Sequence, residues 1–198
     1  LGEMQTLASD VGGLKRVLTN VKNRGGWGEV QLSRQLEDIL TPGQYEQNVV
    51  IKSGTQESVE FAVKLPGRDD EGPVYLPIDS KFPQEDYERL LQAQESGEKA
   101  DVDVSVRALE RAITQQAKLI SDKYIAPPNT TDFAIMYLPT EGLFAEAVRR
   151  PGLASKLQNE LRVLVTGPTT LMSLLNSLQM GFRTLAIERR SSEVWQVL

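Results

Sequence analysis

The sequence of 198 residues predicts a single α/β domain in which helices flank a mixed β-sheet. Apolar residues recur at helical spacing in some segments, and they alternate or run continuously in five short segments. These segments follow one another along the chain in the order α, βββ, αα, β, αα, β and α. No low-complexity linker and no shift in composition divides the chain, so we expect one domain.

Residues 1–23 form the first predicted helix. Its apolar residues are spaced by four, three, four and three positions: Leu7, Val11, Leu14, Leu18 and Val21. Such a seam is typical either of the end of a coiled coil or of an amphipathic helix packed on the domain, and two heptads do not separate these alternatives. We therefore expect residues 1–23 to be a coiled-coil or amphipathic helix, followed by the α/β domain over 24–198. Because the chain begins at Leu1, we interpret it as a fragment of a longer protein.

The remaining elements are predicted from periodicity and from turn residues. The glycines of 24–28 are expected to interrupt the first helix, and a second helix is expected to end at Thr41-Pro42-Gly43. Strands over 48–52, 58–65 and 74–81 are expected to pair as a meander. Two helices are expected next, over 84–96 and 101–124, with a polar turn or hinge in 94–103. A strand over 132–138 follows, and then two helices over 141–150 and 153–160. The last elements are a strand over 162–166 and a helix from 169 to the end.

The composition excludes several kinds of site. The chain has no cysteine, which excludes disulfides, thiolate nucleophiles and thiolate metal sites, and no histidine, which excludes a Ser-His-Asp triad. A metal ion would need oxygen ligands, which favours Mg²⁺, Mn²⁺ or Ca²⁺. The net charge of −5, with the acidic excess in the first half, argues against a histone-like cationic surface but permits a local basic groove.

Four charged residues form the candidate site. Asp79 and Lys81 are two positions apart in a predicted strand, so their side chains project from the same face. Glu60 lies in the preceding strand on the face opposite Val59 and Phe61, where an antiparallel partner would bring it beside Asp79. Glu29 is expected to open the second helix. From spacing alone, Asp79 and Lys81 also fit an ordinary solvated ion pair, with Glu60 a polar surface residue.

Three carboxylates and a lysine at one sheet edge are suited to phosphodiester hydrolysis. The carboxylates of Glu29, Glu60 and Asp79 would bind Mg²⁺ or Mn²⁺, which lowers the pKa of a bound water and neutralises charge on the phosphate. Lys81 would orient that water or stabilise the developing oxyanion. Direct attack by Ser80 is disfavoured, because no base flanks it.

Six blocks of the sequence resemble the RmuC family and occur in the family's order. They are 24–30 (RGGWGEV), 45–47 (YEQ), 59–66 (VEFAVKLP), 78–81 (IDSK), 137–141 (YLPTE) and 167–171 (GPTTL). The resemblance implies a PD-(D/E)xK, restriction-endonuclease-like fold, in which Glu29 is the acidic residue of the core helix and Asp79 with Lys81 form the (D/E)-x-K pair. The chain departs from the pattern at Val59-Glu60, where the family motif has Pro-Asp. Gln47 and Glu141 match family blocks without an assigned role.

The resemblance also implies a function and a setting. RmuC-like proteins are bacterial and are linked to DNA recombination, in which they limit inversions between short repeats. They carry a membrane anchor and a coiled coil before the nuclease-like domain, which implies the bacterial cytoplasm, a tether to the inner membrane outside this fragment, and homo-oligomers through the coiled coil. Two alternatives to a metal-dependent DNA nuclease stay open: a non-catalytic DNA-binding or scaffolding module that keeps the nuclease fold, and an interaction domain without a nucleic-acid partner.

Overall fold

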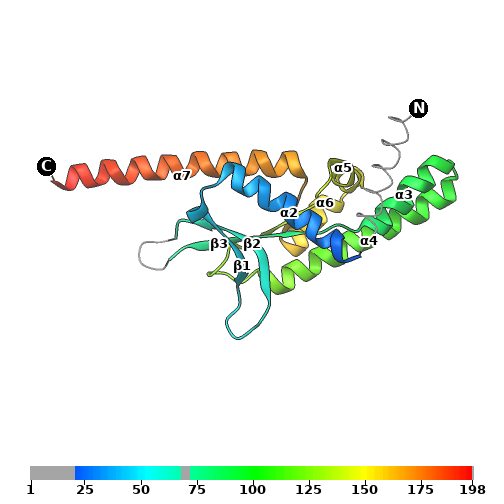
Figure 1. Cartoon of the computed structure of the whole chain (residues 1–198), viewed down its shortest axis with the longest axis horizontal. Helices are drawn as coiled ribbons and strands as arrows, with labels where there is room; N and C mark the ends of the chain where they lie inside the picture. The colour runs from blue at the N-terminus through cyan, green and yellow to red at the C-terminus, as the bar shows by residue number, and fades with distance from the viewer. Residues whose placement is uncertain (1–20, 68–71, 198) are drawn as a thin grey trace, which may run out of the picture.

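The protein folds as a five-stranded mixed sheet between two layers of helices (Figure 1). The computed structural model describes residues 21–67 and 72–197, and it describes side chains from Gly26 onward. The helices are α2 (Val21–Ile39), the 3-10 helix η1 (Pro42–Gln44), α3 (Gln84–Ser96), α4 (Lys99–Tyr124), α5 (Glu141–Arg149), α6 (Leu153–Leu161) and α7 (Pro168–Val197). The α/β class predicted from the sequence is confirmed.

The strands follow their order in the chain across the sheet. They are β1 (Tyr45–Val50), β2 (Ser58–Leu65), β3 (Val74–Ser80), β4 (Ala134–Tyr137) and β5 (Val163–Thr166). The first three pair antiparallel, which confirms the predicted meander, and β3, β4 and β5 pair in parallel. All four residues of β4 are buried, because strands flank it on both sides and helices cover both of its faces.

Two hydrophobic cores lie on opposite faces of the sheet. On one face, leucines of α2 and α7 pack against residues of β2, β3 and β4 that include Ile78, Ile135 and Tyr137. On the other face, α3, α4, α5 and α6 cover Ala134, Met136 and Val163. The alternation of β4 residues between these cores follows from the period of two in a strand.

Helix α2 runs without interruption through the glycines that were predicted to break it. Gly28 lies inside the helix, and a Cβ atom there would be 2.5 Å from Ser80 Oγ and 3.1 Å from Pro139 Cγ. The missing side chain therefore lets α2 approach the ends of β3 and β4 closely. Trp27 packs beside it against Phe82, with ring centroids 5.9 Å apart. The prediction of a turn over 24–28 was wrong because tertiary packing favours glycine here despite its low helix propensity.

This packing predicts opposite effects for two neighbouring glycines of α2. Gly28→Ala should lower the free energy of unfolding by about 1–3 kcal/mol, because the added methyl group overpacks the contact with Ser80 and Pro139. Gly26→Ala should raise it by about 0.5–1 kcal/mol, because nothing lies within 4 Å of that position and alanine is the better helix former. Urea unfolding of both variants measures the difference. Equal effects at the two positions would show that helix propensity alone governs this segment.

Two further boundaries differ from the prediction. The polar segment 94–103 contains only a short break, because α3 continues to Ser96 and α4 begins at Lys99. Gly97, with φ of 75°, ends α3 in the left-handed conformation that favours glycine. The first strand covers Tyr45–Val50 rather than 48–52, because Tyr45 already pairs with Val63. The heptad seam predicted over 1–23 lies almost entirely outside the described residues.

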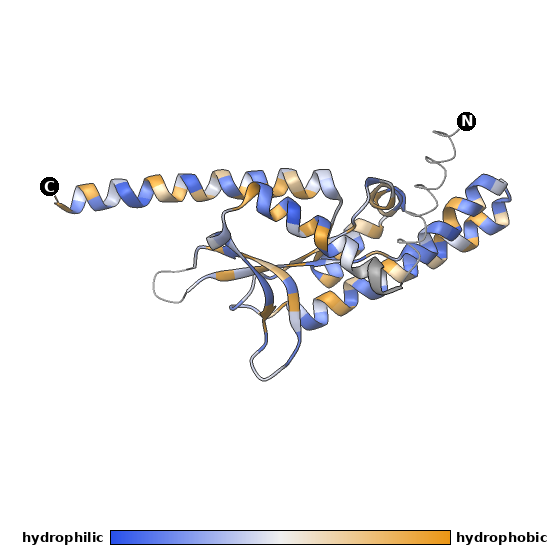
Figure 2. Cartoon of the chain, viewed as in Figure 1, coloured by the Kyte–Doolittle hydropathy of each residue, from blue (hydrophilic) through white to orange (hydrophobic). Residues whose placement is uncertain are grey.

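Helix α7 extends far beyond the sheet (Figure 1). Its first half is anchored by Leu171 and Leu175, whereas every residue from Arg183 to Val197 is exposed. Hydrophobic residues continue along this exposed part (Figure 2). Its large exposed apolar side chains include Ile187 and Trp195. In the part of the chain that the structure describes, no helix combines the length and the apolar character needed to cross a bilayer.

Candidate active site

Glu60 and Asp79 lie side by side on adjacent antiparallel strands. Phe61 of β2 pairs with Ile78 of β3, so the next residues in this register are Glu60 and Asp79. The backbone N–H of Ser80 donates a hydrogen bond of 2.9 Å to Glu60 Oε2, which fixes the carboxylate against β3. Phe61 belongs to the core beneath α2, whereas Val59, which was expected on the same face, packs in a separate small cluster beside β1. The expected juxtaposition of Glu60 and Asp79 is confirmed.

Asp79 and Lys81 form an ion pair at the end of β3. Lys81 Nζ lies 2.6 Å from Asp79 Oδ2, in agreement with their expected projection from one face. The Asp79 side chain is almost fully buried, whereas the Lys81 side chain is 28% exposed. Lys81 therefore links a buried carboxylate to the surface of the protein.

The two carboxylates disfavour each other's charge. Burial is the largest cause that raises the pKa of Glu60 to about 8, and the charges of Asp79 and Glu29 add to this, whereas the Ser80 N–H and the Lys81 charge oppose it. Burial also raises the pKa of Asp79, against the opposing effect of Lys81. At neutral pH the pair therefore holds a proton, as expected for two carboxylates that share a poorly solvated site.

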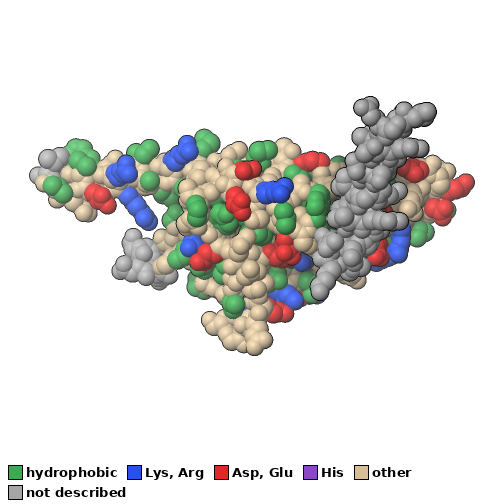
Figure 3. Space-filling view, viewed as in Figure 1, with side chains coloured by type: hydrophobic (Ala, Val, Ile, Leu, Met, Phe, Trp, Pro, Cys, Tyr) green, Lys and Arg blue, Asp and Glu red, His purple; other side chains and the backbone are tan. Residues whose placement is uncertain are grey.

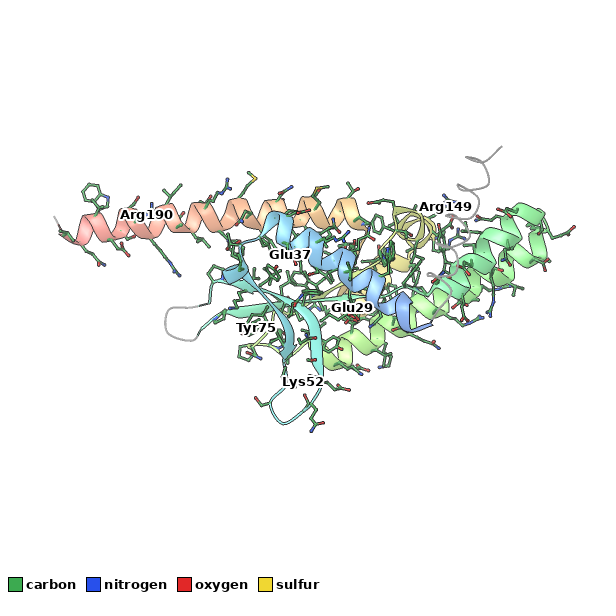
Figure 4. The ribbon with its side chains drawn as sticks, viewed as in Figure 1. Glu29, Glu37, Lys52, Tyr75, Arg149 and Arg190 are labelled. Carbon is green, nitrogen blue, oxygen red and sulfur yellow. The ribbon has the colours of Figure 1, made fainter. Side chains whose placement is uncertain are left out.

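Glu29 reaches this site from α2. It lines a groove of about 250 Å³ together with residues of α2, β1 and β2: Val30, Ser33, Gln47, Asn48, Glu60 and Phe61. Figure 4 shows Glu29 on α2 beside the sheet. The expectation that Glu29 opens a helix was wrong, since the glycine segment before it is helical, but the expectation that it shares a cleft with Glu60 is confirmed.

The C-terminal end of α4 contributes residues that the sequence did not indicate. Burial, followed by the charges of Asp79, Glu60 and Glu57, raises the pKa of Tyr124 to about 12. The charge of Lys123 lowers the pKa of Asp79, and its ammonium pairs with Glu57 at 3.0 Å. These residues lie more than forty positions after Asp79, and only the packing of α4 across the sheet brings them near.

Asn48 is a second feature that the sequence did not reveal. The pairing of β1 with β2 places it opposite Glu60, and its φ is 53°. Asparagine tolerates this left-handed conformation better than most residues. Asn48 lines the groove, and Gln47 beside it donates a hydrogen bond of 3.3 Å to Ser33 Oγ.

The donor set partly fits a divalent cation. Among residues 21–67 and 72–197, no three acidic side chains converge closely enough to surround a metal ion together. Mg²⁺, however, is commonly held by one or two carboxylates, with water and phosphate oxygens completing its shell. Glu60 and Asp79 supply two carboxylates, and apart from Lys81 the buried Asp79 Oδ2 has no partner among the described residues. The role of Glu29 as a further ligand stays a prediction.

Glu141 lies away from this site and has a structural contact. Its Oε1 accepts a hydrogen bond of 2.5 Å from the backbone N–H of Thr169, in the first turn of α7. A carboxylate is favoured there by the partial positive charge of a helix N-terminus. Thr140, just before Glu141, caps α5 by accepting a hydrogen bond from the Leu143 N–H.

Comparison with known proteins places this fold and site in context. The profile of the RmuC family matches residues 1–198. A DNA recombination protein RmuC homolog from Xylella fastidiosa is 64% identical over the whole chain, which covers 44% of that protein. The DNA recombination protein RmuC of Escherichia coli K12 is 30% identical, in a match that covers 79% of the chain and 33% of that protein. A homolog from Chlamydia trachomatis is 27% identical, in a match that covers 98% of the chain and 43% of that protein. The chain thus spans less than half the length of these relatives, and no solved structure matches it.

Proposed function

The chain belongs to the RmuC family, and from this premise we propose that it is a DNA-processing domain that hydrolyses phosphodiester bonds with Mg²⁺ or Mn²⁺. The single observation that carries this proposal is the pairing of Glu60 with Asp79 in register, beside Lys81. Relatives named DNA recombination protein supply the biological setting. As the resemblance to the family implies, we include in the proposal a role in limiting inversions between short repeats.

The order of elements supports a nuclease-like fold. Helix α2, the meander of β1, β2 and β3, the helices α3 and α4 and the parallel strand β4 give the order αβββααβ. The (D/E)-x-K pair lies at the end of the third strand, which is where the resemblance to the PD-(D/E)xK fold predicts it. We therefore propose this fold for the chain on the basis of its topology and the position of Asp79 and Lys81.

Each residue of the site has a distinct task in this proposal. Glu60 and Asp79 would hold the cation, which when bound supplies charge neutralisation at the phosphate. Lys81 would leave Asp79 and donate hydrogen bonds to the phosphate or to the attacking water. Glu29, on the exposed side of the groove, would accept a proton or orient water.

A non-catalytic DNA-binding or scaffolding module is the second candidate. The ion pair between Lys81 and Asp79 favours it. Lys81 Nζ lies 2.6 Å from Asp79 Oδ2, so the ammonium group takes the position at which a metal ion would bind that oxygen. A retired nuclease site would keep such a pair because each charge stabilises the other. The oligomer through residues 1–23, the tether to the inner membrane and the cytoplasmic location stay predictions.

A metal titration distinguishes these two candidates. We expect isothermal calorimetry to show binding of Mg²⁺ or Mn²⁺ at millimolar concentration or below, and we expect Asp79→Asn to abolish it, because the variant removes one of two carboxylate ligands. Glu57→Gln is the matched control, since Glu57 is an exposed carboxylate paired with Lys123 near the same site.

The titration must include DNA before it is decisive. Mg²⁺ sites that use phosphate oxygens as ligands are complete only with substrate bound. Binding that is absent with and without a DNA duplex would refute the metal-dependent mechanism and favour the scaffolding module. Binding that survives in Asp79→Asn would place the cation elsewhere.

A further inference from the structure

A groove between α4 and α6 concentrates positive charge at a distance from the candidate active site. It encloses about 440 Å³ and is lined by Arg107, Glu110, Arg111, Thr114, Gln115 and Lys156. Three of these side chains are cations, and only Glu110 opposes them. Within residues 21–67 and 72–197, none of the three cations forms an ion pair, in contrast to the paired cations Lys118, Lys123, Arg149 and Arg150.

We propose that this groove binds the phosphate backbone of DNA at a distance from the bond being cleaved. Arg107 and Arg111 are four residues apart, so they project from one face of α4, about one helical turn from each other. Arginine presents a planar set of donors that matches phosphate oxygens. The groove has no hydrophobic lining residue, and it therefore lacks the aromatic or aliphatic anchors that dominate protein–protein interfaces.

Helix α4 runs from this groove to the candidate site. The inference rests on the proposed function, because it assigns the groove to the same DNA that the candidate site would cleave. Tyr124, the last residue of α4, lies in the electrostatic field of Asp79 and Glu60. At about 1.5 Å per residue, Arg111 and Arg107 lie about 20 and 25 Å from Tyr124 along the helix axis. A duplex rises about 3.4 Å per base pair, so the groove corresponds to phosphates about 6–7 base pairs from the reacting one.

The exposed arginines of α7 are a weaker candidate for the same ligand. Figure 3 shows basic side chains on the part of α7 that projects past the sheet, and the exposed arginines of this part are Arg183, Arg189 and Arg190. That helix belongs to the layer on the opposite face from α4 and α6. The groove, by contrast, is concave and gathers cations from two elements of one layer, which positions several donors around a phosphate.

The experiment measures DNA binding by the full chain in EDTA, where hydrolysis does not interfere. Fluorescence anisotropy would compare labelled hairpins with stems of about 6 and about 20 base pairs, chosen from the rise of about 3.4 Å per base pair. We expect Arg107→Gln with Arg111→Gln to weaken binding to the long stem by about tenfold or more. We also expect this double variant to reduce the dependence of log affinity on log salt by about two units, since each lost phosphate contact contributes about 0.9. The wild type should bind the short stem more weakly than the long stem, because a short stem cannot reach the groove and the candidate site together.

Two variants control for charge and for folding. Arg189→Gln with Arg190→Gln removes the same number of charges from exposed positions of α7 and should leave the affinity for the long stem near that of the wild type. Arg107→Lys with Arg111→Lys keeps the charge and should restore most of the binding. An equal loss in both glutamine double variants, an equal affinity of the wild type for both stems, or the absence of DNA binding by the wild type would each overturn the inference. DNA binding that depends on the groove, together with no cleavage in Mg²⁺ or Mn²⁺, would refute the proposed hydrolysis. The inference that the groove binds DNA would still stand.

Discussion

Asp79→Asn is expected to lower the rate of the proposed Mg²⁺-dependent DNA cleavage by about 10³-fold. Charge stabilisation by a bound metal contributes several kcal/mol to a transition state, and each 1.36 kcal/mol corresponds to about tenfold in rate. Asp79 is buried and adjacent to Glu60, so its loss removes one of the two neighbouring carboxylates that are proposed to hold the cation. A quenched-flow or gel assay with a labelled duplex and saturating Mn²⁺ measures the change.

The same substitution should not unfold the protein, which makes the result interpretable. Asparagine has the shape of aspartate. It also removes a carboxyl group whose ionised form is disfavoured by burial, since burial raises the pKa of Asp79. Thermal unfolding of Asp79→Asn in EDTA should therefore occur at or above the wild-type temperature. Cleavage that persists in a folded Asp79→Asn variant, while Glu57→Gln behaves as wild type, would mean that the reaction takes place at other residues.

The second large effect concerns Glu60 and pH. In EDTA we expect the wild type to lose stability as pH rises from about 5 to 8, and we expect Glu60→Gln to lose much less. The folded state raises the pKa of Glu60 from its usual 4.5 to about 8, so between these values the native protein binds a proton that the unfolded chain releases. The stabilisation is complete below about 4.5 and disappears as pH approaches 8, with a slope of at most about 1.4 kcal/mol per pH unit.

Urea unfolding at pH 5.5, 7 and 8 tests this expectation. Glu60→Gln should be more stable than the wild type at pH 8, because glutamine retains an acceptor for the Ser80 N–H without a charge. Added Mg²⁺ should restore wild-type stability at pH 8 and not that of the variant, since a ligand bound only by the native state stabilises it. A wild type that is equally stable at pH 5.5 and pH 8 would show that Glu60 titrates normally.

Most of the fold was predictable because its elements carry strong local patterns. The strand Ser58–Leu65 has its predicted bounds, and the helix Gln84–Ser96 lies where a helix near 84–96 was predicted. The failures occur where tertiary contacts outweigh local preference. Gly28 remains helical because α2 approaches Ser80 and Pro139, which no local pattern reveals.

The candidate site was only partly predictable for a similar reason. Asp79 and Lys81 are neighbours in sequence, and the period of two in a strand is enough to place them together. Glu60 required the correct pairing of two strands, which a meander provides by its connectivity. Tyr124 and Asn48 could not be found, because the first depends on the path of a long helix across the sheet and the second on a local backbone distortion opposite Glu60.

The two halves of helix α7 contribute unequally to the stability of the fold. At about 1.5 Å per residue its thirty residues span about 45 Å, yet only Leu171 and Leu175 are buried. The free energy of unfolding is therefore nearly independent of the side chains beyond Arg183, including Trp195, which is 77% exposed. The outer arm can vary in sequence without a cost to the sheet, and a small rotation at its anchored base is magnified into a displacement of several ångströms at its tip.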